Sequence, residues 1–264
     1  MSSCHCCAFA IALSLLLLAA GAALAQPPAA VQYYVIHQEH AKPSKIEQYE
    51  ATAKEFAALV QAHHETMPTF SYVVSVGTDF TYTYVAPIAN MAAMDAINAG
   101  FGALAAKTGE QFTDLMRRAS ETVTGNSEMI AAYVPELSYT PAAPRLTPEE
   151  ARYAKLDLYA VEPGREGDAD AFVRDYVALF KAKGITSGYQ LFKVVMGPDL
   201  PALVVRIPAK DPADWYTANQ KLQEQLGAEG QALAARVMAI TRYFDSRETW
   251  RCPDLDLPPM AAKE

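Results

Sequence analysis

Short apolar runs and longer amphipathic runs alternate along the chain. Residues 31–40 are rich in strand-forming side chains, and residues 43–60 repeat apolar side chains about every 3.6 positions, which predicts a strand followed by a helix. A hairpin is predicted over 70–86 around a glycine-containing turn, then a glycine-interrupted helical stretch over 91–124 and a strand over 127–134. The predicted order is β-α-β-β-α-β.

The second half of the chain repeats this order. The predicted elements are a strand over 153–161, a helix over 168–183, a hairpin over 188–207, a helical stretch over 213–243 broken at Gly227, and a strand over 247–252. This order is the split β-α-β pattern, which yields a four-stranded antiparallel sheet with helices on one face. We therefore expect two such sheets, each with one face bare.

Residue identities indicate that the two halves arose by duplication. Of the 57 positions from 33 to 89, twelve carry the same residue 120 positions later with no gap, whereas chance gives about 6%. The ends match as well, because Pro135-Glu136-Leu137 resembles Pro253-Asp254-Leu255. The predicted boundaries are a first repeat over 26–141, a linker over 142–151, a second repeat over 152–259 and a tail over 260–264.

Two such sheets can bury their bare faces by packing against each other. The element order, the duplication and the repeated Pro-acidic-Leu signature resemble the dimeric α/β-barrel superfamily in a tandem form, with NIPSNAP-like, EthD-like and antibiotic-biosynthesis-monooxygenase-like proteins among the similar members. The resemblance covers most of residues 31–259 and singles out no one family, so it carries over no catalytic residue. It implies an α+β fold of two ferredoxin-like β-α-β-β-α-β repeats packed sheet to sheet, as a monomer with an internal pseudo-dimer.

The first 25 residues have the pattern of a cleaved signal peptide. An apolar run over 8–25 ends in Ala23-Leu24-Ala25, and small residues at both alanine positions suit signal peptidase. We predict export to the periplasm or out of the cell and no membrane segment after cleavage; the alternative is an uncleaved anchor, since about 18 apolar residues approach spanning length. Cys252 is the one cysteine beyond this segment, so no internal disulfide is expected.

The charge balance argues against two classes of partner. The chain carries 22 Lys+Arg and 30 Asp+Glu, a formal charge of −8, and has no run of basic residues. Nucleic acids and anionic membrane surfaces both attract clustered basic residues. We therefore expect a small molecule as the partner of the exported chain.

Strand parity predicts which side chains enter the space between the two sheets. Leu156, Leu158 and Ala160 form an apolar face that we expect under the helices, and Leu203 and Val205 are expected on that side too. The side chains predicted to line the space, with the first-repeat set transferred by the offset of 120, are Tyr33, His37, Tyr72, Tyr82, Tyr84, Lys155, Asp157, Tyr159 and Arg206.

Aromatic rings with a few titratable groups are typical of a small-ligand cavity. We expect a small apolar or aromatic ligand, bound without catalysis. The second hypothesis is a cofactor-independent enzyme, monooxygenase-like or isomerase-like, in which His37 takes a proton from a bound phenol or enol and Lys155 or Arg206 stabilises the product. The third is a structural or interaction protein whose barrel is packed solid.

The histidines predict no metal site. His37 and His40 lie three apart on a strand and face opposite sides, and the adjacent His63 and His64 diverge by about 100° on a helix. Some proteins of similar architecture bind haem, but the histidines beyond residue 25 all lie in the first repeat and no Cys-x-x-Cys-His motif occurs. We therefore predict no cofactor.

Overall fold

The computed structural model describes residues 31–259. The predicted signal peptide and the predicted tail over 260–264 lie outside the described residues. No helix in the described part is long and apolar enough to cross a membrane.

The first repeat has the predicted order of elements. They are β1 (Tyr33–Ala41), α1 (Ile46–Ala62), β2 (Val73–Gly77), β3 (Thr81–Ile88), α2 (Ala93–Thr108), α3 (Glu110–Ser120) and β4 (Val123–Tyr133), with 3-10 turns η1 (Pro43–Lys45), η2 (His64–Thr66) and η3 (Pro135–Leu137). Of the three glycines expected to interrupt the stretch over 91–124, Gly109 does so, because it separates α2 from α3 with φ of +55°. Because glycine adopts positive φ without a steric penalty, it permits this sharp change of direction. Interruption at Gly100 and Gly102 is wrong, because α2 continues through both.

The second repeat follows the same plan. Its elements are β5 (Tyr153–Val161), α4 (Glu166–Ala182), β6 (Gln190–Met196), β7 (Ala202–Ala209), α5 (Pro212–Met238) and β8 (Thr241–Arg251), with the 3-10 turn η4 (Pro253–Leu255). The predicted break at Gly227 is confirmed as a kink inside α5 with φ of +57°. The helical stretch ends five residues before the predicted 243, because the β-rich run from Thr241 already belongs to β8.

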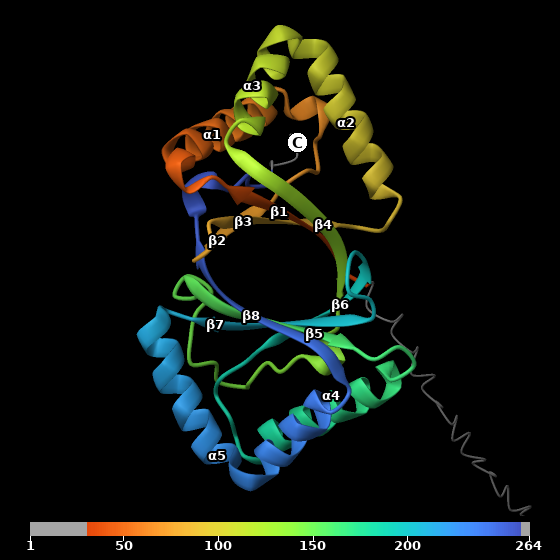
Figure 1. Cartoon of the computed structure of the whole chain (residues 1–264), viewed down its shortest axis with the longest axis vertical. Coiled ribbons are helices and arrows are strands. Elements are labelled where there is room, and N and C mark those ends of the chain that lie inside the picture. Colours follow the sequence, from red (N-terminus) through yellow and green to blue (C-terminus); the bar gives the residue numbers. More distant parts are fainter. Residues whose placement is uncertain (1–30, 260–264) are drawn as a thin grey trace, which may run out of the picture. The chain divides into compact units, whose positions relative to one another are not determined.

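The eight strands close into one antiparallel barrel in the order β1-β3-β2-β8-β5-β7-β6-β4. Each repeat contributes four neighbouring strands, and two seams join them: β2 pairs with β8, and β4 pairs with β6. Helices α1 to α3 cover the outer side of the first sheet, and α4 and α5 cover that of the second (Figure 1). The predicted α+β pseudo-dimeric barrel is confirmed.

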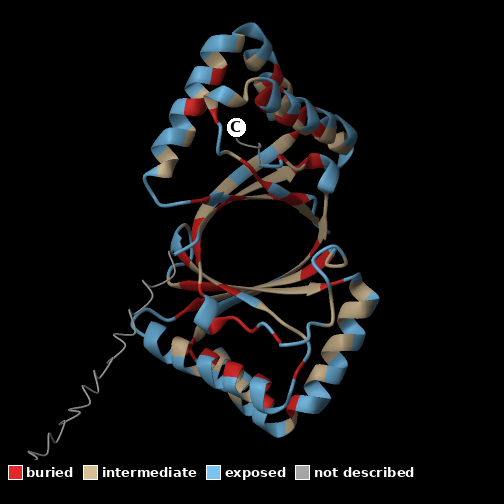
Figure 2. Cartoon of the chain, turned by 180° about the vertical axis from the view of Figure 1, so that it is seen from behind, coloured by how far each residue is buried: buried red, intermediate tan, exposed pale blue. Residues whose placement is uncertain are grey.

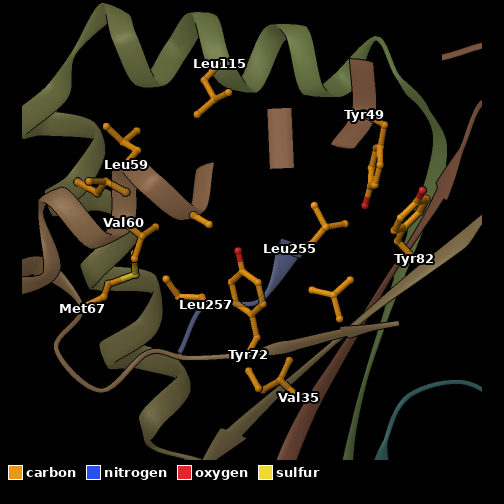
Figure 3. Packing of buried hydrophobic residues seen from close by; sticks show 14 of the residues in the cluster. Val35, Tyr49, Leu59, Val60, Met67, Tyr72, Tyr82, Leu115, Leu255 and Leu257 are labelled. Carbon is orange, nitrogen blue, oxygen red and sulfur yellow. The ribbon is translucent and has the colours of Figure 1, made fainter. Parts of the chain in front are cut away.

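The Pro-acidic-Leu signature marks two arms that the repeats exchange. After β4, Tyr139 forms a β-bridge with Tyr189 of the second repeat, and after β8, Leu257 forms one with Tyr72 of the first. The arms place apolar side chains in the partner repeat's core, as Figure 3 shows for Leu257 near Tyr72. The repeats are therefore joined through side-chain packing as well as through the strand seams.

Matching side chains on the two arms also satisfy strand backbone groups. The Ser138 hydroxyl accepts a hydrogen bond from the Leu191 amide at 2.9 Å, and the Asp256 carboxylate accepts one from the Val74 amide at 2.7 Å. Arg251 donates to both oxygens of Asp256, at 3.2 and 2.6 Å. Buried backbone groups need such partners, so these contacts fix where each arm docks.

Strand pairing shows that the repeats do not align without gaps. His37 and Asp157 occupy equivalent places 120 positions apart, but their cross-strand partners Tyr84 and Val205 are 121 apart. Transferring positions by an offset of 120 therefore assigns the side chains of the third strand in one repeat to the wrong face of the sheet. The ungapped alignment expected from sequence is wrong there, because the hairpin turns of the two repeats differ in length.

Most buried side chains lie between each sheet and its own helices. The first repeat holds one large cluster that includes Leu59, Leu104 and Leu115, and the second repeat holds two smaller ones. In Figure 2 the buried residues concentrate on the strands and on the helix surfaces that face them, whereas the outer helix surfaces are exposed. The candidate site lies in this region, between a sheet and the helices that pack on it.

One glycine permits a close approach of α2 to the turn before β2. A Cβ atom on Gly100 would lie 2.2 Å from the Met67 side chain and 2.8 Å from the Thr66 carbonyl oxygen. Gly102, one half-turn further along the same helix, has no heavy atom within 4 Å of the same position. Substitutions at these two positions therefore test whether α2 packs closely against the turn before β2.

We predict that Gly100→Ala lowers the free energy of unfolding by roughly 1–3 kcal/mol, because the new methyl group overpacks a backbone contact. Gly102→Ala should leave stability unchanged or raise it by up to about 1 kcal/mol, because alanine is the better helix former. Chemical denaturation of the two variants checks this. Equal losses from both would mean that α2 does not contact the turn at Gly100.

Candidate functional site

The register of the first sheet sets which side chains share its outer face. His37 on β1 lies directly opposite Tyr84 on β3 and opposite Glu128 on β4. All three side chains line a cavity together with residues of α1, α2 and α3. His37 therefore faces the helices of its own repeat, and its predicted position between the two sheets is wrong.

The same correction applies to the second repeat. Lys155, Asp157 and Tyr159 line a cavity with residues of α4 and α5, so they face helices and not the other sheet. Asp157 pairs with Val205, and residues paired in this way point to the same side of a sheet. Leu156, Leu158 and Ala160 therefore face the barrel interior. Apolar character did not mark the helix side because both faces of this sheet are covered.

The first cavity has a volume of about 410 Å³ and lies between the first sheet and its three helices. Its apolar wall includes four phenylalanines and comes mainly from the helices. It comprises Val35, Ala53, Phe56, Phe70, Ala86, Met94, Ile97, Phe101, Phe112, Met116 and Ala119. Phe101 is central to this wall, since its ring lies 6.0 Å from that of Phe56 and 5.5 Å from that of Phe70, measured between centroids.

A chain of hydrogen bonds crosses the sheet side of the first cavity. The Tyr49 hydroxyl donates to Glu39 Oε2 at 2.6 Å, and its oxygen lies 2.8 Å from the Tyr84 hydroxyl. Because the Tyr49 proton is used on Glu39, Tyr84 is the donor in the second bond. The other carboxylate oxygen, Glu39 Oε1, lies 3.4 Å from His37 Nε2. Glu39 thus joins the imidazole to two phenols.

The charged forms of His37 and Glu39 stabilise each other. The hydrogen bond to Glu39 raises the pKa of His37 above its ordinary value and outweighs the opposite effect of burial, with Glu128 adding to the rise. Burial acts to raise the pKa of Glu39, but the hydrogen bonds from His37 and Tyr49 lower it overall. Burial raises the pKa of Tyr49 and of Tyr84, so both remain neutral phenols.

Tyr72 supplies a further hydroxyl near this chain. Its ring packs edge-on against that of Tyr84 with centroids 5.2 Å apart, and its side chain rises from the sheet toward the helices (Figure 3). The hydroxyl oxygen is buried and has no hydrogen-bond partner among the described residues. An unpaired buried hydroxyl is costly, so it favours a ligand that offers a polar partner.

Two predicted lining residues lie near the first cavity without lining it. Tyr82 donates a hydrogen bond to Glu50 at 2.8 Å and packs on Tyr49 with ring centroids 4.4 Å apart. Tyr33 pairs with Ile88 and packs against the core cluster of the first repeat. Of the predicted first-repeat residues, His37, Tyr72 and Tyr84 come together in this cavity, which lies under the helices and not between the two sheets as expected.

The second cavity has a volume of about 390 Å³ and is lined by Lys155, Asp157, Tyr159, Trp215 and Phe244 among others. The Lys155 ammonium lies 3.5 Å from a carboxylate oxygen of Glu248 and 5.3 Å from the centre of the Trp215 ring. Asp157 accepts a hydrogen bond from the Ser246 hydroxyl, and burial raises its pKa. The two cavities are therefore separate and carry different polar groups.

Arg206 belongs to neither cavity. It lies opposite Leu156 on β5 and Gln190 on β6, on the barrel-interior face as predicted, and its Nη1 donates to Gln190 Oε1 at 3.0 Å. Burial and the positive charge of Arg251 lower its pKa. Arg206 is therefore not in position to act together with His37 or Lys155.

The polar groups of the two cavities do not form a metal site. Within the part of the chain that the structure describes, no group of three or more His, Cys, Asp or Glu could hold a metal ion. His40 bonds Thr81 at 2.9 Å on the face opposite His37, and β1 continues to Ala41, so the two imidazoles do not converge. The ring nitrogens of His37 lie 3.4 Å from a carboxylate oxygen of Glu39 and 3.7 Å from one of Glu128.

Sequence reasoning missed several residues of the first cavity. Glu39 could have been found, because it lies two positions after His37 and so shares its face of β1. Tyr49 and Phe101 carry no such signal, since helical residues reach a cavity only through the way their helices dock. Glu128 required the pairing of β1 with β4, which joins residues far apart in sequence.

No protein-family model matches the chain, and no curated protein matches it. Its fold is similar to that of an anthrone oxidase-like protein, with a TM-score of 0.61 and 14% identity over 89% of this chain and 97% of that chain. A monooxygenase-like protein of Lactobacillus acidophilus NCFM (TM-score 0.50, 9% identity, 87% and 97% coverage) is also similar. Chlorite dismutase of Candidatus Nitrospira defluvii in complex with imidazole is similar as well, with a TM-score of 0.51 and 11% identity over 84% of this chain and 92% of that chain. The chain therefore has the dimeric α/β-barrel fold.

We predict that His37 titrates above its ordinary value of 6.5 and that Glu39→Gln lowers its pKa, because the main cause of the rise is then removed. A histidine with a raised pKa adds stability that is fully present below pH 6.5 and is lost as the pH rises through the folded-state value. The stability gap between wild type and Glu39→Gln should therefore narrow from pH 6 to pH 9.

Proton NMR of the imidazole across this range, combined with denaturation at each pH, measures both quantities. The variant Glu65→Gln, next to His63 and His64, is the control and should not move the His37 midpoint. An unchanged midpoint in Glu39→Gln would contradict the arrangement of the hydrogen bonds around Glu39.

Proposed function

We propose that the first cavity binds a small aromatic molecule that carries a hydroxyl group or an enolisable carbonyl. The observation that carries this proposal is the hydrogen-bonded chain from His37 through Glu39 and Tyr49 to Tyr84, set into an otherwise apolar and aromatic wall. A mostly apolar cavity with a few convergent polar groups is the usual form of a small-ligand site.

The apolar wall and the hydrogen-bonded side chains contact different parts of such a ligand. Phe56, Phe70 and Phe101 offer rings against which a flat aromatic body packs. A ligand oxygen near the sheet accepts from the unpaired Tyr72 hydroxyl, and a ligand hydroxyl donates to the oxygen of Tyr84, whose own proton is used on Tyr49. The volume of about 410 Å³ suits a molecule of two or three fused rings.

Proton abstraction is the second candidate function, and the placement of His37 favours it. With Nε2–H donating to Glu39, the Nδ1 lone pair remains available as a base, since its 3.7 Å separation from Glu128 is long for a hydrogen bond. For an aromatic ketone, the ring-adjacent C–H bond breaks, the proton moves to Nδ1 and the electron pair moves to the ketone oxygen. Tyr72 donates to the enolate oxygen that forms.

This second function has a direct test. Exchange of the methylene protons of anthrone for deuterium in D₂O reports enolisation without any oxidant. Faster exchange with wild type than with His37→Gln, at equal ligand occupancy, supports catalysis. Equal rates leave binding as the function of the site.

The similar structures support the same chemical class. One of them is named anthrone oxidase-like, and anthrone is a three-ring ketone whose enol form is a phenol. The hypothesis of a structural or interaction protein whose barrel is packed solid concerns the barrel interior, whereas both cavities lie between a sheet and its helices. These cavities favour ligand binding as the function whether or not the barrel interior is filled. Export to the periplasm or medium stays part of the proposal. It is tested by whether Gln26 is the first residue of the protein recovered outside the cytoplasm.

We predict that 2-naphthol binds with a Kd roughly five- to tenfold lower than that of 2-methoxynaphthalene, because only the naphthol donates a hydrogen bond to Tyr84. Tyr84→Phe should remove most of this preference. The matched control is Tyr189→Phe, which deletes a buried phenol in the second cavity and should keep it. Isothermal titration calorimetry of the three proteins with both ligands gives the ratios.

Three results would contradict the proposed binding site. They are the absence of binding by either ligand, equal affinity of wild type for both, and loss of the preference in Tyr189→Phe alone. The last result would place the ligand in the second cavity.

A further inference from the structure

The second cavity differs from the first in its balance of charge. Lys155 is compensated, because its ammonium lies 3.5 Å from Glu248 and over the Trp215 ring. Asp157 receives one hydrogen bond, from the Ser246 hydroxyl, and no other hydrogen bond among the described residues. Lys155 and Asp157 line the cavity, and Glu248 pairs with Lys155 without lining it. With all three side chains ionised, this group carries one excess negative charge, and Asp157 is its member without an ion-pair partner within 4 Å among the described residues.

The position of Asp157 makes this charge available to a ligand. Its carboxylate is half-buried, its hydrogen-bond partner Ser246 is uncharged, and the nearby charge of Lys155 is shared with Glu248. A positive charge on a ligand beside Asp157 would therefore offset the cost of burying the carboxylate. Burial raises the pKa of Asp157, and the negative charge of Asp245 adds to the rise, whereas the hydrogen bond from Ser246 and the positive charge of Lys155 lower it. A second anion is disfavoured here, whereas a cation gains both an ion pair and a hydrogen bond.

Aromatic rings surround the same part of the cavity. Tyr159 on β5 and Phe244 on β8 pack together with ring centroids 4.9 Å apart, and Trp215 of α5 lines the cavity as well. The faces of such rings attract organic cations and also bury an apolar body. The Tyr189 hydroxyl, buried and without a partner among the described residues, adds one polar group at the wall.

We propose that the second cavity is a separate binding site for an organic amine with an aromatic body, whose ammonium group pairs with Asp157. The body of the amine lies against Tyr159, Phe244 and Trp215. The two repeats then present different ligand chemistry at equivalent places, because His37 of β1 corresponds to Asp157 of β5. This site does not depend on the function proposed for the first cavity.

Tryptophan fluorescence gives a readout that belongs to the second cavity. Trp215 lines it, whereas the residues that line the first cavity include no tryptophan. Titration with 2-phenylethylamine should change the emission in a saturable way, with a Kd roughly tenfold or more below that of 2-phenylethanol or 3-phenylpropionate. Trp215→Phe should remove the signal while calorimetry still detects binding.

Two variants locate the amine. Asp157→Asn should raise the Kd for 2-phenylethylamine roughly tenfold or more and bring it close to that of the neutral alcohol. Glu39→Gln, which neutralises a carboxylate that lines the first cavity, should leave the Kd unchanged. The circular dichroism spectrum and melting temperature of each variant establish that it is folded.

Three outcomes overturn the proposal. They are equal affinity of wild type for the amine and the alcohol, tighter binding of the carboxylate than of the amine, and unchanged amine affinity in folded Asp157→Asn. Loss of amine binding in Glu39→Gln with retention in Asp157→Asn also overturns it, because the amine then occupies the first cavity. Failure of 2-naphthol to bind bears only on the first cavity.

Discussion

The mutual pairing of sheet edges is the constraint on which the rest of the structure depends. A four-stranded sheet has two edge strands with unpaired backbone groups, and the two repeats satisfy each other's edges through the β2–β8 and β4–β6 seams. The exchanged arms strengthen this union, since Leu137 and Leu255 are fully buried. Closure covers one face of every strand, so the ligand-facing side chains are those that point toward the helices.

Equivalent positions in the two repeats have acquired different chemistry on this shared frame. His37 of the first repeat is equivalent to Asp157 of the second, and Glu39 is equivalent to Tyr159. All four side chains face the helices of their own repeat. One cavity therefore holds an imidazole–carboxylate–phenol chain and the other a carboxylate beside a compensated lysine. A duplicated scaffold keeps its strand geometry while a few side chains on one face set what each half binds.

The sequence predicted the element order, the duplication and the helix breaks at Gly109 and Gly227, because period and glycine placement are local signals. It did not predict which face of each sheet meets the helices. Leu156 and Leu158 read as a core-facing stripe, yet they face the barrel interior, because both sides of this sheet are buried and hydrophobicity does not separate them. Cross-strand register resolves the ambiguity, and register is a property of pairing between distant segments that one strand does not encode.

The central claim is that the aromatic ligand lies between the first sheet and its helices, beside His37, and not in the space enclosed by the barrel. Intermolecular nuclear Overhauser effects between 2-naphthol and the protein test it most directly. We expect contacts from the naphthol ring to Phe101, Met94 and Tyr84, which line the first cavity. Contacts instead to Tyr34, Tyr133 and Phe192, which pack together on the barrel-interior face, would contradict it.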